Sequence, residues 1–199
     1  AKSGADVVEV VARVSRPASY NADDQVFYEV VKAPAPQVGP TLTPLIEEFM
    51  GAKDSLRLET HDAFGNEYSV DLRRGKDGEK TLKSGRWMEQ KRFYEAMRPD
   101  KPASGPNGTL HHLFGVHSYV TTYADEDFIR LDLRVHNGMS GLDQQDQIDN
   151  PNDNIYFESL DLVVPKGWTV IQDFSDPFLA APIQKKRYTA FPLVEATAN

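Results

Sequence analysis

The stretch DFIRLDLRVH, residues 127–136, alternates apolar and polar side chains without a break. In a β-strand successive side chains point to opposite faces of the sheet, so this period of two predicts a strand with one apolar and one polar face. The apolar face is predicted to carry Ile129, Leu131, Leu133 and Val135. Such strands are typical of antiparallel sheets, which bury their apolar face against a second layer of structure.

Similar patterns recur along most of the chain. Further strands are predicted at residues 6–14, 25–33, 86–97 and 154–165, with a hairpin over residues 55–74. Residues 86–97 also have a composition that suits a helix, but their alternation favours a strand. The last of these strands changes phase near Ser159, which indicates a β-bulge. The one predicted helix covers residues 43–53, where Pro44 stands near the start and Gly51 near the end.

Long polar segments separate these elements, at residues 33–40, 98–109 and 138–154. Loops of more than about 12–15 residues usually have a function or lack a fixed structure. We therefore expect an all-β fold, an antiparallel β-sandwich or barrel with one short helix and long polar loops, in a single domain over residues 1–199. The chain begins with Ala1 rather than Met, which favours a module of a larger protein.

The composition argues against several classes of function. The chain has no cysteine, so disulfides, thiolate nucleophiles and cysteine-bound metal centres are ruled out. The net charge is −8, and the longest basic stretch is Lys185–Tyr188, so we expect no binding to nucleic acids or to a membrane surface. The chain also lacks a phosphate-binding loop and a serine-nucleophile motif.

Three of the five histidines lie in the segment HHLFGVHSY, residues 111–119. On one straight strand these histidines would occupy two faces and span about 20 Å, so they could not bind a single metal ion. A site for a transition metal therefore needs ligands from another strand. The candidate set is His117 with His136 from a neighbouring strand and Asp132 as the carboxylate.

A second candidate metal site is the oxygen-rich loop at residues 143–154. Its carboxylates are Asp143, Asp146, Asp149 and Asp153. Calcium prefers six to eight oxygen ligands, so calcium is the cofactor that such a loop would suit. The loop lacks the spacing of an EF-hand, and a solvated polar loop explains the same composition.

Aromatic side chains give a further set of candidates, because their rings can stack on sugar rings. The candidate carbohydrate-binding residues are Trp87, Trp168, Tyr119 and Tyr123. Aromatic residues in sheet proteins more often pack in the core. A binding role for them requires that their faces be exposed along one groove.

Two segments within Gly115–Trp168 carry a resemblance to a known family. SYVTTYADEDFIRLDLRVHNG reads as a strand, an acidic turn and a strand, and NIYFESLDLVVPKGW reads as a later strand. This pattern resembles the β-rich N-terminal domain of rhamnogalacturonan exolyase-like carbohydrate-active proteins, and segments of large exported bacterial proteins. The resemblance implies an accessory sandwich whose chemistry lies on a separate, downstream helical domain, and it assigns no catalytic residue to this chain.

These observations predict a non-catalytic structural or interaction domain of a larger extracellular or particle-forming assembly. Its partners would be other protein subunits, bound through loops and through sheet edges that accept another strand. The first alternative is a carbohydrate-binding or carbohydrate-processing module with a polysaccharide as its partner. The second alternative is a metal-dependent enzyme that uses His117 and His136. The expected location is extracellular, on a cell surface or on a particle.

Overall fold

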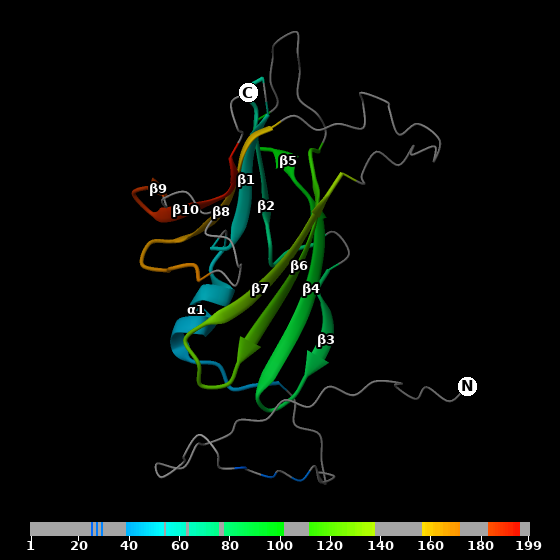
Figure 1. The fold of residues 1–199 in the computed structure, drawn as a ribbon, viewed down its shortest axis with the longest axis vertical. Coiled ribbons are helices and arrows are strands. Elements are labelled where there is room, and N and C mark those ends of the chain that lie inside the picture. Colours follow the sequence, from blue (N-terminus) through cyan, green and yellow to red (C-terminus); the bar gives the residue numbers. More distant parts are fainter. Residues whose placement is uncertain are drawn as a thin grey trace, which may run out of the picture.

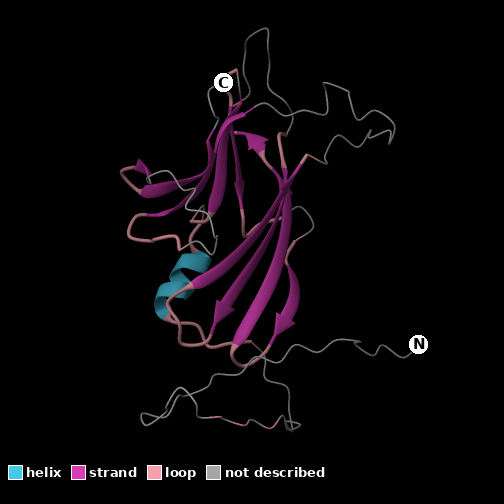
Figure 2. Cartoon of the chain, viewed as in Figure 1, coloured by secondary structure: helices cyan, strands magenta, loops and turns pink. Residues whose placement is uncertain are grey.

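Two antiparallel sheets face each other, and one short helix lies beside them (Figure 1). The structure is a computed structural model that describes residues 39–53, 55–62, 64–75, 78–101, 112–137, 157–171 and 183–195, together with Gln25, Phe27 and Glu29. Strands dominate this part of the chain (Figure 2), and neither sheet closes into a barrel within it. The prediction of an all-β sandwich with one short helix is therefore confirmed.

The six-stranded sheet has the strand order β5-β2-β1-β8-β10-β9, and the four-stranded sheet has the order β3-β4-β6-β7. The elements are α1 (Pro44–Gly51), β1 (Arg57–Asp62), β2 (Glu67–Asp71), β3 (Lys80–Ser84), β4 (Met88–Ala96), β5 (Arg98–Pro99), β6 (Gly115–Tyr123), β7 (Ile129–His136), β8 (Phe157–Pro165), β9 (Ile183–Gln184) and β10 (Tyr188–Glu195). All strand pairs are antiparallel.

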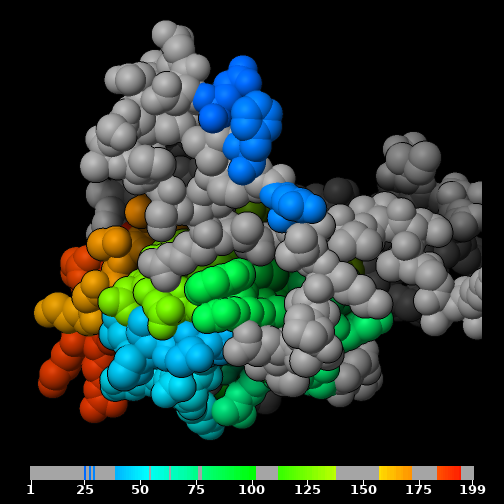
Figure 3. Space-filling model, turned by 90° about the horizontal axis from the view of Figure 1, so that it is seen from below, coloured from blue at the N-terminus to red at the C-terminus, as the bar shows by residue number. Residues whose placement is uncertain are grey.

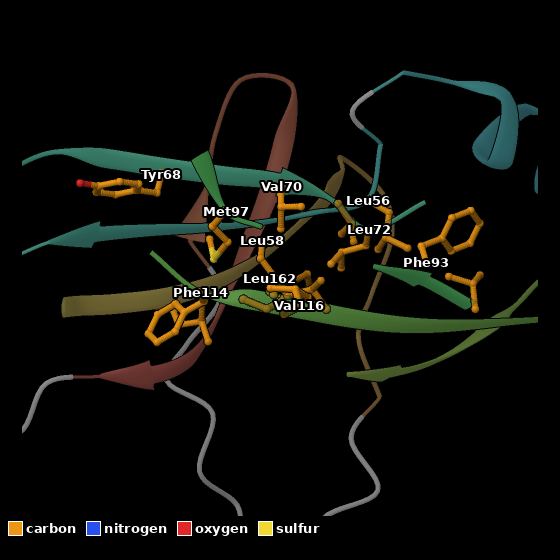
Figure 4. Packing of buried hydrophobic residues seen from close by; sticks show 14 of the residues in the cluster. Leu56, Leu58, Tyr68, Val70, Leu72, Phe93, Met97, Phe114, Val116 and Leu162 are labelled. Atoms are coloured by element: carbon orange, nitrogen blue, oxygen red, sulfur yellow. The ribbon is translucent and has the colours of Figure 1, made fainter. Parts of the chain in front are cut away.

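The core lies between the two sheets and is built from the alternating apolar positions of their strands (Figure 4). Leu58 of β1 is opposite Val70 of β2 on one side and Leu162 of β8 on the other, so the three side chains share one face. The four-stranded sheet adds Phe93 and Val116 to the same cluster. Burial of these side chains provides the main stabilisation of the sandwich, because each is worth roughly 1.5–3 kcal/mol relative to an exposed position.

Helix α1 forms where the sequence predicts it. Thr43 caps the N-terminus by accepting a hydrogen bond at Oγ1 from the amide of Ile46, and Pro44 occupies the first turn, where no amide donor is needed. Ile46 and Phe49 point into the protein and are buried. Seen from below, the cyan segment that contains the helix lies beside the green strands of the four-stranded sheet (Figure 3).

Several local predictions are confirmed by the strand register. Residues 86–97 contain strand β4, and residues 55–74 form the hairpin of β1 and β2. The predicted bulge near Ser159 exists, since His61 pairs with Ser159 while Asp62 pairs with Phe157. The extra residue in β8 shifts the alternation of side chains at this point.

The segment HHLFGVHSY is only partly a strand, which corrects the prediction. Strand β6 begins at Gly115, and the described residues that precede it run irregularly. Leu113 and Phe114 are both buried although they are consecutive. Both side chains belong to the same core cluster, whereas a regular strand points consecutive side chains to opposite faces, so the backbone leaves the strand conformation here.

Other predictions fall outside the described residues. These are the strand at residues 6–14, nearly all of the strand at 25–33, and most of the loops at 33–40, 98–109 and 138–154. Asp143, Asp146, Asp149 and Asp153 lie in the last of these loops, so calcium binding by that loop stays a prediction.

Candidate functional site

The polar side of the four-stranded sheet brings together side chains that are far apart in the sequence. We call it the outer face; it consists of the alternate side chains of β3, β4, β6 and β7 that point away from the six-stranded sheet. Strand pairing puts His117 between Tyr94 of β4 and Arg134 of β7. In the next row, Arg92, Tyr119 and Asp132 lie side by side in the same way. Of the sequence-derived candidates that the structure describes, those on this face are His117, Tyr119, Tyr123, Asp132 and His136.

Three rings cluster on this face. The ring centroids of Tyr94 and His117 are 4.3 Å apart, and those of His117 and His136 are 5.3 Å apart. The rings of Tyr94 and His136 are nearly parallel, with an interplanar angle of 5°. His136 is paired with Gly115, which has no side chain, and this leaves room for the imidazole to approach His117. The structure thus places His117 and His136 side by side on neighbouring strands, and a role for them in metal binding stays a prediction.

The surroundings of His117 favour its neutral form. Burial lowers the pKa of His117 below 6.5, and the neighbouring His136, Arg92 and Arg134 lower it further. Nδ1 of His117 and Nε2 of His136 are buried, and neither has a hydrogen-bond partner in the part of the chain that the structure describes. The neutral form of His117 is thus favoured beside two guanidinium groups.

A pH-dependent stability follows from this environment. The contribution of His117 is complete above its ordinary pKa of 6.5, and it is lost as the pH falls from there through the lowered pKa. We expect His117→Phe, which retains a ring beside Tyr94, to show a smaller loss of stability between about pH 7.5 and pH 5 than the unchanged protein. Urea unfolding at each pH measures this difference.

The control for this experiment is Thr121→Val, on the same face of β6. Threonine does not titrate, so this variant should keep the full pH dependence even if its overall stability changes. Equal pH dependence in His117→Phe and in the unchanged protein would contradict the assignment of the effect to His117.

Of the candidate metal ligands His117, His136 and Asp132, the structure brings together only the two histidines. Asp132 forms an ion pair with Arg130, with 3.1 Å between Oδ1 and Nη2. No group of three or more histidine or carboxylate side chains that could hold a metal ion occurs among the described residues. His117 and His136 thus lie together without Asp132 as a third ligand. The register explains this, since His136 lies in the row on one side of His117, opposite Gly115, and Asp132 lies in the row on the other side, opposite Tyr119.

The candidate carbohydrate-binding residues do not lie together. Tyr119 and Tyr123 are on the outer face, and the ring of Tyr123 packs on Phe128 at 5.0 Å. Trp87 is in the turn between β3 and β4, beneath the guanidinium group of Arg86. Trp168 packs against the core, with its ring centroid 4.1 Å from that of Phe49. This contact with helix α1 separates Trp168 from the outer face.

The outer face also carries a set of basic residues that the sequence pattern did not reveal. The basic side chains there are Lys80, Lys83, Arg92, Arg130 and Arg134. Asp132 is the one carboxylate on this face of the described strands. These residues are spaced two or more apart on different strands, so no basic run marks them in a chain whose net charge is −8.

Three of the four sheet edges formed by described strands are poor templates for another strand. Strands β5 and β9 have two residues each, and β5 contains Pro99. Strand β3 has a register shift between Thr81 and Lys83, and all of its residues are exposed. Short edges, bulges, lysine and proline all discourage the addition of a strand.

Strand β7 is different from these edges. It has eight residues, pairs with β6 without a register shift, and has no other described strand beside it (Figure 1). Its apolar residues Leu131 and Leu133 pack against the core but are only half-buried, whereas Val116 and Val120 of the adjacent strand are 2% exposed. The core is therefore incompletely covered along this edge.

Comparisons with protein-family models, with curated proteins and with solved structures found no match to this chain. The resemblance to rhamnogalacturonan exolyase-like domains therefore stays a prediction. Among the described residues, no helix has both the length and the apolar character needed to cross a membrane.

Proposed function

We propose that this chain is a non-catalytic interaction domain of a larger assembly, and that a protein partner docks along β7. The observation that carries the proposal is the edge itself. β7 is the long, regular edge strand of the described fold, and its apolar side chains are left half-buried. A strand added there would pair the outward backbone groups of β7 and cover Leu131 and Leu133.

The outer face supports a protein partner better than a polysaccharide. Sugar recognition by aromatic rings needs ring faces that are open to the ligand, but Tyr94, His117 and His136 turn their faces toward one another. Trp168 packs against Phe49, away from this surface. The extracellular or particle-associated location belongs to the same proposal, as the setting of such an assembly.

Hydrogen–deuterium exchange tests the proposal. The amides of β7 are expected to exchange more slowly in the native assembly than in the isolated, dilute chain, because a partner strand would pair those that point outward. Strand β3, the other edge of the same sheet, serves as the internal control and should exchange equally in both states.

Unchanged exchange of β7 in the native assembly would contradict the proposed docking edge. Binding of the isolated chain to a polysaccharide, abolished by Tyr119→Ala or Tyr123→Ala, would favour the carbohydrate-binding alternative instead.

A further inference from the structure

We propose that β7 pairs antiparallel with β7 of a second copy of this chain, with Leu133 of each copy opposite Leu133 of the other. This inference rests on the proposed docking edge and names its occupant. It would join the four-stranded sheets of two copies into one continuous sheet across a two-fold axis. Such isologous contacts are the commonest way in which identical chains assemble.

Charge complementarity selects the second copy and the register. With Leu133 at the centre, Asp132 of each copy lies opposite Arg134 of the other, on the outer face. Opposite charges in directly opposed positions stabilise a strand pair. Within the described residues Arg134 has no ion-pair or hydrogen-bond partner, so the second copy would supply its carboxylate.

The same charge pattern disfavours a pair whose centre is moved by one residue, from Leu133 to Asp132. With Asp132 at the centre, Asp132 would face Asp132, and Arg130 of each copy would face Arg134 of the other. Like charges in directly opposed positions destabilise a strand pair. The alternation of charge along β7 therefore discriminates between neighbouring registers.

The beginning of β7 also disfavours a register centred on Leu131. That register would require the second copy to lie along residues 126–128. The loop that leads into β7 is already engaged there, because Thr43 donates from Oγ1 to Oδ1 of Asp127 at 2.6 Å and the amide of Asp125 donates to the carbonyl of Thr41. Helix α1 lies beside this end of the strand (Figure 1). Among the described residues, no hydrogen bond of this kind engages the later half of β7.

In the same register, the apolar side chains of β7 in the two copies also face each other. Leu133 of each copy meets its equivalent, and Leu131 of each copy lies opposite Val135 of the other. These side chains already pack against the core and are half-buried. Their remaining exposed surface would be covered without moving the strand.

A contact made by one strand from each copy is small, so we expect dissociation in the micromolar range. Native mass spectrometry of the chain from about 1 to 200 µM should show a dimer fraction that rises with concentration. A purely monomeric chain at every concentration would overturn the self-pairing. The docking-edge proposal is judged separately, by exchange of β7 in the native assembly.

Charge reversal tests the register. Arg134→Asp would place two carboxylates opposite each other at each end of the pair, and Asp132→Arg would do the same with two guanidinium groups. Each single variant is expected to be monomeric where the unchanged chain is dimeric. Because both side chains lie on the outer face, folding of each variant should be retained, which circular dichroism checks.

Mixing the two variants supplies the decisive comparison. In a mixed pair one copy carries carboxylates at both positions 132 and 134, and each of them faces a guanidinium group of the other copy. Heterodimers should therefore form while both homodimers stay absent. The double variant Asp132→Arg with Arg134→Asp should restore the homodimer. If either single variant remains dimeric, or if the mixture gives no heterodimer, this register is wrong.

Discussion

Arg73→Ala is expected to lower the free energy of unfolding by about 4 kcal/mol. The side chain of Arg73 is 6% exposed and holds the C-terminal end of helix α1. Nη1 donates to the carbonyls of Phe49 and Met50, both at 2.7 Å, and Nη2 donates to the carbonyl of Ala52 at 2.5 Å. These carbonyls belong to the last turn of the helix, where no intrahelical donor is available.

Two consequences add up in this variant. The partly buried carbonyls of Phe49 and Met50 would lose their donor, and Asp71 would lose the guanidinium group 3.4 Å from its Oδ2. Removing one partner of a buried charged network costs more than the net value of the network, because the remaining groups stay desolvated.

Urea unfolding followed by circular dichroism measures the change. The matched control is Arg74→Ala, since Arg74 is the next residue, is 64% exposed and contacts Asp71 at 3.5 Å. A surface ion pair of this kind is worth about 0–1 kcal/mol. If Arg73→Ala cost no more than Arg74→Ala, Arg73 would not be the residue that holds the helix end.

Asp62→Ala is expected to lower the free energy of unfolding by about 3 kcal/mol. Asp62 is 4% exposed and organises the turn between β1 and β2. Its Oδ1 accepts from the amides of Phe64 at 2.9 Å and Asn66 at 2.8 Å. Its Oδ2 accepts from Nδ2 of Asn66 at 2.7 Å and from the hydroxyl of Tyr68 at 3.2 Å. Alanine would leave all of these donors without their acceptor.

The same carboxylate contributes to acid sensitivity. Burial raises the pKa of Asp62, but its hydrogen bonds to Asn66, Phe64 and Tyr68 outweigh that effect and lower the pKa below 3.8. Its contribution to stability is therefore complete above pH 3.8 and is lost as the pH falls through the lowered pKa. The loss from Asp62 begins at about pH 3.8, whereas the loss from His117 begins at about pH 6.5, so the two effects start at different pH values.

Asp62→Asn distinguishes the charge from the shape of the side chain. It should flatten the dependence of stability on pH below about pH 4, and urea unfolding across that range measures this. Glu67→Ala is the control, because its side chain is 65% exposed in the same hairpin. A loss of stability in Glu67→Ala as large as that in Asp62→Ala would mean that Asp62 has no special place in the turn.

Local features of the fold were predictable because their causes are local. The hairpin, helix α1 and strand β4 follow from alternation, from a capping residue and from turn residues that lie within a few positions of one another. The bulge near Ser159 was visible as a change of phase in one strand. The strand predicted over residues 111–119 was wrong at Leu113 and Phe114 because the cause there is not local: tertiary packing draws both consecutive side chains into the core.

For the candidate site, the sequence predicted on which face of its strand a residue lies, but not how residues of different strands are arranged. Alternation placed Asp132 and His136 on the polar face of their strand, and the pairing of His117 with His136 was anticipated as a hypothesis. The position of His117 between the rows of Asp132 and His136 depends on the register between β6 and β7, which the local pattern does not contain. The basic outer face was missed for the same reason.

The sequence by itself determined that the chain forms half-buried strands, where its helix begins, and which side chains of a strand share a face. These properties arise from the geometry of neighbouring residues along one backbone. Only the tertiary structure decided that β7 lies at an edge, that His117 meets His136, and that Trp168 packs on Phe49. Strand order and register depend on contacts between distant segments, where many pairings satisfy the same alternation and packing of the whole core selects one.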